Sequence, residues 1–171
     1  APLVVARAIN RATTNAKKNM AKETSGKYFV SSGDVKKTIT VTKATKSSLK
    51  AAVISNGTGI ALSKFKVSPG TPVRYRGKNR SPKVYKAGVE KAGGVKPLDG
   101  DQKSFIAIMK SGHKGVFTRT SGQSLPIKQL YGPSVPQMIK NEKIMKAIND
   151  DANETLQKRI DAEIANLLRK G

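Results

Sequence analysis

Apolar side chains recur at every fourth position of the segment 141–170, and this period constrains the fold more than any other feature of the sequence. Residues four apart lie on neighbouring turns of one side of an α-helix. Arg169 and Lys170 close the segment, where the helix dipole favours positive charge. The sequence therefore predicts one long amphipathic C-terminal helix. Its apolar positions are Ile144, Ile148, Ala152, Leu156, Ile160, Ile164, Leu167 and Leu168.

The apolar stripe of this helix winds around its axis. A four-residue repeat advances by about 40° per step against a turn of about 3.6 residues. One surface cannot cover such a stripe, unless the helix bends. We expect residues 148–160 to cover the protein's own sheet, including Phe105 and Ile108, and we expect Ile164 and Leu168 to contact a neighbouring subunit.

Residues 3–22 show helical spacing on a strongly basic background, and Gly26 is predicted to end this helix. A cap at residues 32–34 predicts a short helix over residues 35–39. Residues 38–42 also alternate as a strand does, so this boundary stays open. The apolar positions of the first helix are Val5, Ile9, Ala12, Ala16 and Met20.

Strands are predicted on both sides of a glycine-rich and proline-rich region. Residues 48–67 alternate around a turn at residues 56–59, which predicts a β-hairpin. Residues 68–98 are basic and interrupted by Gly and Pro, which predicts a long loop or extended arm, or the two strands of a protruding hairpin. Residues 104–120 predict a strand pair, and residues 125–131 are extended.

These elements define the predicted fold class as α+β in a single domain, residues 1–171. It has an N-terminal helix, a small and mostly antiparallel β-sheet with a long basic loop or arm, and a long C-terminal helix packed on the sheet.

Positive charge dominates the first part of the chain. The protein has 33 Lys and Arg against 11 Asp and Glu, a net charge of +22. Residues 1–98 hold 21 basic and 3 acidic residues, whereas residues 99–171 hold 12 and 8. A field of this sign attracts polyanions. The second part has the balanced charge of a packed domain.

The basic loop is the predicted DNA-facing surface, with a merely solvated loop as the alternative. Lys and Arg contact phosphates without reading base sequence, and no base-reading motif is present. Tyr75 and Tyr85 are interleaved and could stack on unpaired bases or pack the arm onto a neighbour. The predicted DNA-facing residues are Arg74, Arg76, Lys78, Arg80, Lys83 and Lys86.

An enzyme is not expected, because the chain lacks convergent titratable groups. There is no Cys, and the single histidine, His113, sits in a glycine-flanked turn. The pairs Asp99 with Asp101 and Asp150 with Asp151 give no metal site in this reading. We therefore predict no catalytic residue, no metal and no cofactor. No run approaches the roughly 20 apolar residues of a membrane span, so no membrane partner is expected.

An ordered set of short motifs from residue 104 onward resembles the minor tail protein Z family of lambda-like phages. Residues 105–113 and 115–117 give two apolar strands around a Lys-x-Gly turn, and residues 125–127 read Leu-Pro-Ile. Residues 130–136, which include Gly132-Pro133-Ser134-Val135-Pro136, then lead to the long helix. Residues 8–12 and 21–24 resemble the family's first helix.

This resemblance implies a non-enzymatic tail-completion protein at the head-proximal end of the tail, the head–tail junction. It implies a ring, with six copies expected, that adjoins neck and tail proteins such as the tail terminator and head-completion proteins and holds double-stranded DNA in its lumen. The location would be the virion, and the host cytoplasm during assembly. The alternative is a ribosomal or other sequence-independent nucleic-acid-binding protein.

Overall fold

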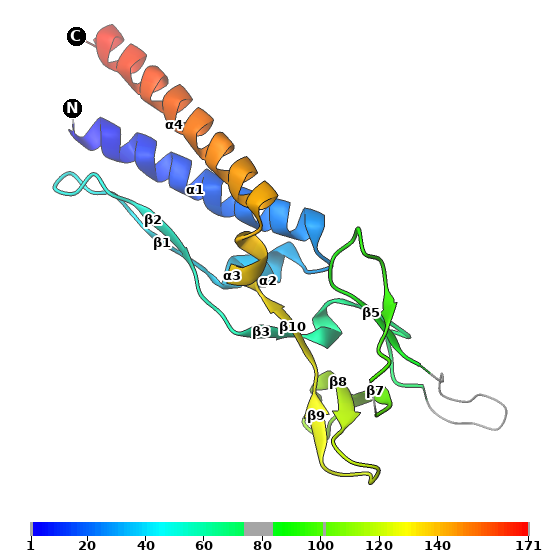
Figure 1. Ribbon diagram of the computed structural model, residues 1–171. Coiled ribbons are helices and arrows are strands. Elements are labelled where there is room, and N and C mark those ends of the chain that lie inside the picture. The colour runs from blue at the N-terminus through cyan, green and yellow to red at the C-terminus, as the bar shows by residue number, and fades with distance from the viewer. Residues whose placement is uncertain (1, 74–83, 101, 171) are drawn as a thin grey trace. The chain divides into compact units, whose positions relative to one another are not determined.

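A computed structural model describes residues 2–73, 84–100 and 102–170. The protein has an N-terminal helix, small antiparallel sheets and a long C-terminal helix (Figure 1), which confirms the predicted α+β class. The chain divides into two compact units. Residues 1–26, 32–57 and 135–171 form the first unit, and residues 27–31 and 58–134 form the second.

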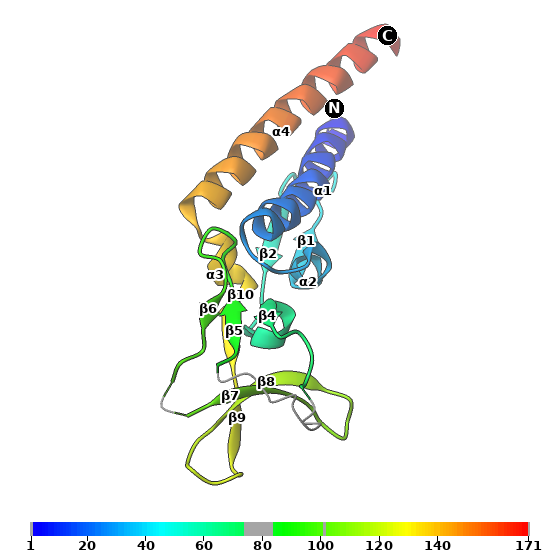
Figure 2. The ribbon, with the colours of Figure 1, turned by 90° about the vertical axis from the view of Figure 1, so that its right-hand side faces the viewer.

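Two long antiparallel helices lie side by side in the first unit (Figures 1 and 2). They are α1, Pro2–Lys27, and α4, Glu142–Lys170. The Asn15 amide donates hydrogen bonds to the Asp151 carboxylate (3.0 Å) and to the Thr155 hydroxyl (2.9 Å). The Asn19 amide donates to the same carboxylate. These polar contacts fix the register of the two helices, because each Asn on α1 meets its partner on α4.

Within the first unit, α4 pairs with α1. The strand that contains Phe105 and Ile108, which we expected the middle of α4 to cover, belongs to the second unit, so that contact stays a prediction. Ile144 and Ile148 are buried near the start of α4, with 4% and 3% exposure. The period of the apolar residues predicts that one face of α4 is buried. It does not predict the partner helix, because the asparagine side chains that contact α4 from α1 follow no periodic pattern.

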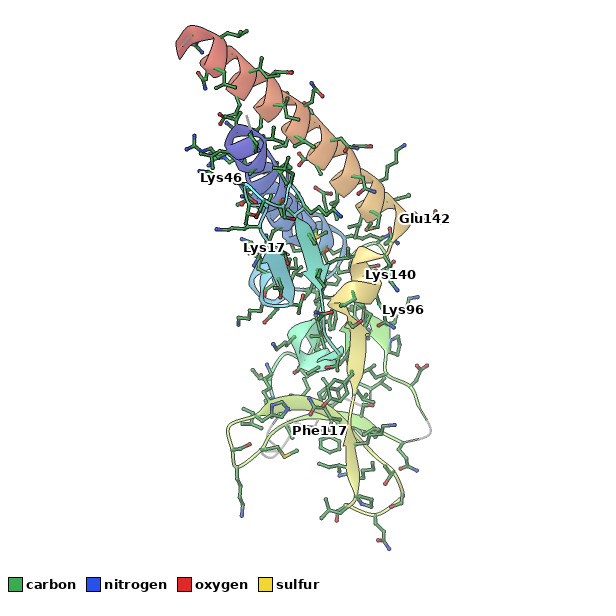
Figure 3. All side chains as sticks on the ribbon, turned by 90° about the vertical axis from the view of Figure 1, so that its left-hand side faces the viewer. Lys17, Lys46, Lys96, Phe117, Lys140 and Glu142 are labelled. Carbon is green, nitrogen blue, oxygen red and sulfur yellow. The ribbon has the colours of Figure 1, made fainter. Side chains whose placement is uncertain are left out.

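A two-stranded ribbon runs along α1. It pairs β1, Ile39–Thr42, antiparallel with β2, Ala52–Ser55. The Asn10 side chain fastens the ribbon to α1 through both backbone groups of Ala44, donating to the carbonyl at 2.9 Å and accepting from the N–H at 2.8 Å. The Lys17 ammonium, labelled in Figure 3, donates to the Ile39 carbonyl at 2.8 Å.

The predicted hairpin over residues 48–67 is wrong, because β2 pairs back to β1. The Asn56 N–H donates to the Thr38 carbonyl and closes that ribbon. The next strand, β3 (Gly59–Ala61), pairs instead with β10, Tyr131–Ser134, far along the chain. The structure also decides between helix and strand for residues 38–42. Helix α2, Ser32–Lys37, ends before β1 begins, so this stretch is a strand.

Residues that lead into α4 complete the core of the first unit. A short helix, α3 (Val135–Ile139), carries Pro136 in its first turn, where a missing N–H is tolerated. Its apolar side chains are buried together with those of α2, β1 and the start of α4. The buried set is Val35, Ile39, Val135, Met138, Ile139, Ile144 and Ile148.

The second unit holds three small antiparallel sheets around a short 3₁₀ turn, η1 (Leu62–Lys64). One sheet pairs β3 with β10, and the other two are β4–β5–β6 and β7–β8–β9. The strands of the last are β7 (Ser104–Ile108), β8 (Lys114–Arg119) and β9 (Ile127–Gln129). The strand pair predicted over residues 104–120 is confirmed, with Phe105 opposite Phe117 and their ring centroids 6.1 Å apart.

The region predicted as a basic loop or arm, residues 68–98, is partly regular. Its start, middle and end pair in one sheet through β4 (Lys66–Ser68), β5 (Lys86–Gly88) and β6 (Lys96–Pro97). Gly88 is required where β5 passes the following turn, because a Cβ there would collide with the Gly94 carbonyl oxygen. β4 and β5 are therefore neighbouring antiparallel strands of one sheet, as the predicted reading of this region as a protruding hairpin requires at its two ends.

Candidate nucleic-acid interface

Two basic side chains project from one face of the β4–β5–β6 sheet. Lys66 lies opposite Gly88, and Lys86 lies opposite Ser68. Opposite residues of an antiparallel pair, and residues two apart on a strand, share one face. Both lysines are exposed. The Lys66 ammonium also lies 5.2 Å from the centroid of the Phe29 ring, so a cation–π contact holds its charge at this surface.

The sheet carries one end of the predicted DNA-facing segment, because Lys86 lies on β5, on the exposed face just described. Lys96 of β6, labelled in Figure 3, pairs opposite Ala87 and lies on the other face. The other predicted DNA-facing residues fall outside the described residues. These are Arg74, Arg76, Lys78, Arg80 and Lys83.

Tyr85 does not serve as a platform for bases. Its side chain is 3% exposed, and burial raises the pKa of its hydroxyl, although a hydrogen bond to the Val73 backbone acts in the opposite direction. The Leu98 N–H donates to its carbonyl at 2.8 Å. Tyr85 therefore anchors the base of the arm in the core of the second unit. Tyr85 directly precedes β5, and Tyr75 lies outside the described residues.

A second group of basic side chains, in the first unit, escaped the sequence analysis. A groove of about 600 Å³ lies between α1 and α4, and an adjoining hollow of about 430 Å³ shares Arg11, Thr14 and Arg159 with it. The groove collects Lys18 and Lys158 as well, and the hollow collects Arg7, Lys43 and Glu163. No local motif could reveal this group, since it forms only when residues from both ends of the chain meet.

Large apolar side chains are exposed on the last turns of α4. Ile164 is 48% exposed, Leu167 is 47% exposed and Leu168 is 80% exposed. These include the two residues that we expected to contact a neighbouring subunit, Ile164 and Leu168. Within the first unit, this end of α4 thus offers apolar surface that the unit itself does not bury.

The titratable residues considered above are dispersed. His113 is exposed, and its Nε2 lies 3.1 Å from the Gln129 side-chain oxygen. Asp151 accepts hydrogen bonds from α1, whereas Asp150 is exposed. Within residues 2–73, 84–100 and 102–170, no three His, Asp or Glu side chains gather closely enough to hold a metal ion. Of the helices in the same part of the chain, none is both long and apolar enough to span a membrane.

The comparison with known families identifies one match, which covers nearly the whole chain. A family model described as prophage minor tail protein Z matches residues 1–170. No curated protein and no solved structure matches the chain significantly.

Proposed function

The chain belongs to the prophage minor tail protein Z family and is a structural component of a phage tail, and from this premise we propose that it completes the tail as a ring at the head-proximal end. The ring joins the tail to the head and presents a basic surface to the DNA in its lumen. Its proposed partners are other copies of this chain, with six copies in the ring, the adjoining tail terminator and head-completion proteins, and duplex DNA.

The observation that carries the assembly part of this proposal is the exposed apolar end of α4. Complete burial of a leucine or isoleucine side chain stabilises by about 1.5–3 kcal/mol relative to leaving it in water. Ile164, Leu167 and Leu168 therefore offer several kcal/mol to a neighbouring subunit. A contact between this end and a different surface of the next copy is heterologous, and heterologous contacts generate rings when the rotation closes.

The net charge supports the part of the proposal that concerns DNA. Six copies would carry six times +22, and such a ring needs a polyanion to offset its self-repulsion. Lys66 and Lys86 share one exposed face, and the sequence between them adds further cations, which would contact phosphate without reading bases. Binding to DNA should accordingly be independent of sequence.

Electron microscopy of phage particles that carry a gold-labelled tag on this chain tests the proposed position. The label should appear at the junction of head and tail, and tails assembled without the chain should fail to join heads. Sedimentation of the purified chain with a short duplex should give a closed oligomer. A label along the tube or at the distal tip would refute the head-proximal ring.

A further inference from the structure

The groove between α1 and α4 has the composition of a phosphate-binding surface. Four basic side chains, Arg11, Lys18, Lys158 and Arg159, line it together with Thr14, Asn15 and Thr155. The Thr14 hydroxyl and the Asn15 amide already donate within the subunit, so the basic side chains are its main donors for a ligand. Arg, Lys, Thr and Asn side chains supply much of the hydrogen bonding to DNA phosphates. No aromatic and no large apolar side chain lines the groove. The groove thus lacks the apolar core that protein interfaces have and the stacking platforms that single strands use.

The charges of the groove are available to a ligand. Among the described residues, Arg11 and Arg159 form no ion pair, whereas Lys158 pairs with Glu154 on its own helix. The Asp151 carboxylate beside the groove accepts hydrogen bonds from the neutral amides of Asn15 and Asn19 and keeps its negative charge, which acts on Lys158. The adjoining hollow contains one carboxylate, Glu163, against four cations, of which Arg7 and Lys43 do not line the groove itself. Positive charge therefore prevails along both.

The cations on α1 also have a spacing that suits a duplex. Arg7 and Arg11 lie about 6 Å apart along the helix axis, and Lys18 follows about 10 Å further. One DNA strand carries a phosphate about every 3.4 Å of duplex axis. This row of cations therefore spans about five phosphates of one strand, and Arg159 faces it from α4.

We propose that the α1–α4 groove is a second DNA-binding site, which holds the phosphate backbone of duplex DNA through Arg11, Lys18 and Arg159. The inference rests on the DNA contact proposed above but is separate from the arm, because it concerns the other compact unit. It adds affinity and no base specificity.

A matched pair of double variants tests the groove in the full chain. Arg11→Gln with Arg159→Gln removes two groove cations, and Lys36→Gln with Lys46→Gln removes two exposed cations from the same unit. Glutamine preserves helix propensity. Binding of a short random duplex is measured at several salt concentrations. The groove variant should lower the slope of log K against log salt by about 1.8, since each released counterion contributes about 0.9. The control should lower it by less than half of that.

A second variant keeps both arginines and repels phosphate instead. Thr14→Glu places a carboxylate where the groove meets the hollow, and Thr40→Glu makes the same change on the exposed face of β1. Only Thr14→Glu should weaken the binding of DNA, by at least tenfold at low salt, with unchanged circular dichroism.

The outcomes separate this inference from the proposed function. If the unmodified chain does not bind duplex DNA, the DNA contact itself is refuted. If it binds and both groove variants bind like their controls, only the groove site is refuted. A competition with poly-glutamate gives a further outcome. If the groove variants lose the binding of poly-glutamate but keep the binding of DNA, the groove site for DNA is refuted, because its occupant is then an acidic protein segment.

Discussion

Single alanine substitutions at Ile148 and Leu168 separate the part of α4 that stabilises the subunit from the part that we propose for assembly. Both remove a branched aliphatic side chain from one helix, and alanine is the best helix former, so neither change weakens the helix itself. Ile148 is 3% exposed, and truncating a buried isoleucine costs about 2–5 kcal/mol. Leu168 is 80% exposed, so the isolated subunit loses only about a fifth of a full burial term, roughly 0.3–0.6 kcal/mol.

Urea denaturation of the monomer measures both values, and sedimentation of the assembled form measures the second effect. Ile148→Ala should move the unfolding midpoint strongly, because 2–5 kcal/mol is a large share of the about 5–15 kcal/mol that stabilises a domain. Leu168→Ala should leave the midpoint almost unchanged and shift the oligomer toward monomer. If Leu168→Ala destabilises the monomer as much as Ile148→Ala does, the end of α4 is buried within the subunit and the proposed interface is wrong. An unchanged oligomer would contradict it equally.

Three further predictions concern stability. Asp151→Ala should lower the free energy of unfolding by about 1–3 kcal/mol in urea titrations, because two asparagine amides lose their acceptor. An unchanged midpoint would show that the hydrogen bonds of Asn15 and Asn19 to Asp151 do not stabilise the pairing of α1 with α4. Gly88→Ala should cost about 1–3 kcal/mol through its collision with a carbonyl oxygen, whereas Gly122→Ala, with open space around it, should stay within about 0.5 kcal/mol. Burial raises the pKa of the Tyr85 hydroxyl above its usual 10.0. The stability that this shift contributes is complete below pH 10.0 and is lost as the pH rises through the pKa of the folded state. The melting temperature of Tyr85→Phe should therefore fall less above pH 10 than that of the unmodified chain.

Elements with a dense local pattern could be predicted from the sequence, and their partners could not. The period over residues 141–170 predicted α4, and the paired apolar runs around His113 predicted β7 and β8, because in each case the signal and the contact are close in the chain. Strand β3 has three residues and pairs with β10 about seventy positions later. A strand of three residues is too short for its sequence to indicate which strand it pairs with. The turn motif at residues 56–59 therefore led to the wrong prediction of a hairpin with the preceding strand.

The candidate site shows the same limit. The density of Lys and Arg in residues 74–86 predicted a basic arm, and Lys86 lies on an exposed sheet face. The α1–α4 groove has no such density, since Arg11 and Arg159 approach each other only through the pairing of two helices. That pairing depends on Asn15 and Asn19 meeting Asp151. In the sequence, those three residues look like ordinary solvated positions.

A combined variant asks whether the arm and the groove bind one duplex together. The arm set replaces Arg74, Arg76, Arg80 and Lys83 with Ser, and the groove set is Arg11→Gln with Arg159→Gln. If one duplex contacts both sites, each set lowers the salt slope by about 0.9 per cation, so the losses are about 3.6 and 1.8 and add to about 5.4 in the combined variant. Additivity is expected because the sets lie in separate compact units. If each site instead binds DNA independently, a variant that carries only one set still binds DNA through the other site. Most of the salt slope is then lost only in the combined variant. We expect the additive result, since in the proposed ring both sites would face the DNA that the ring encloses. The non-additive result would place the two sites on different molecules of DNA and would refute a common lumen for both.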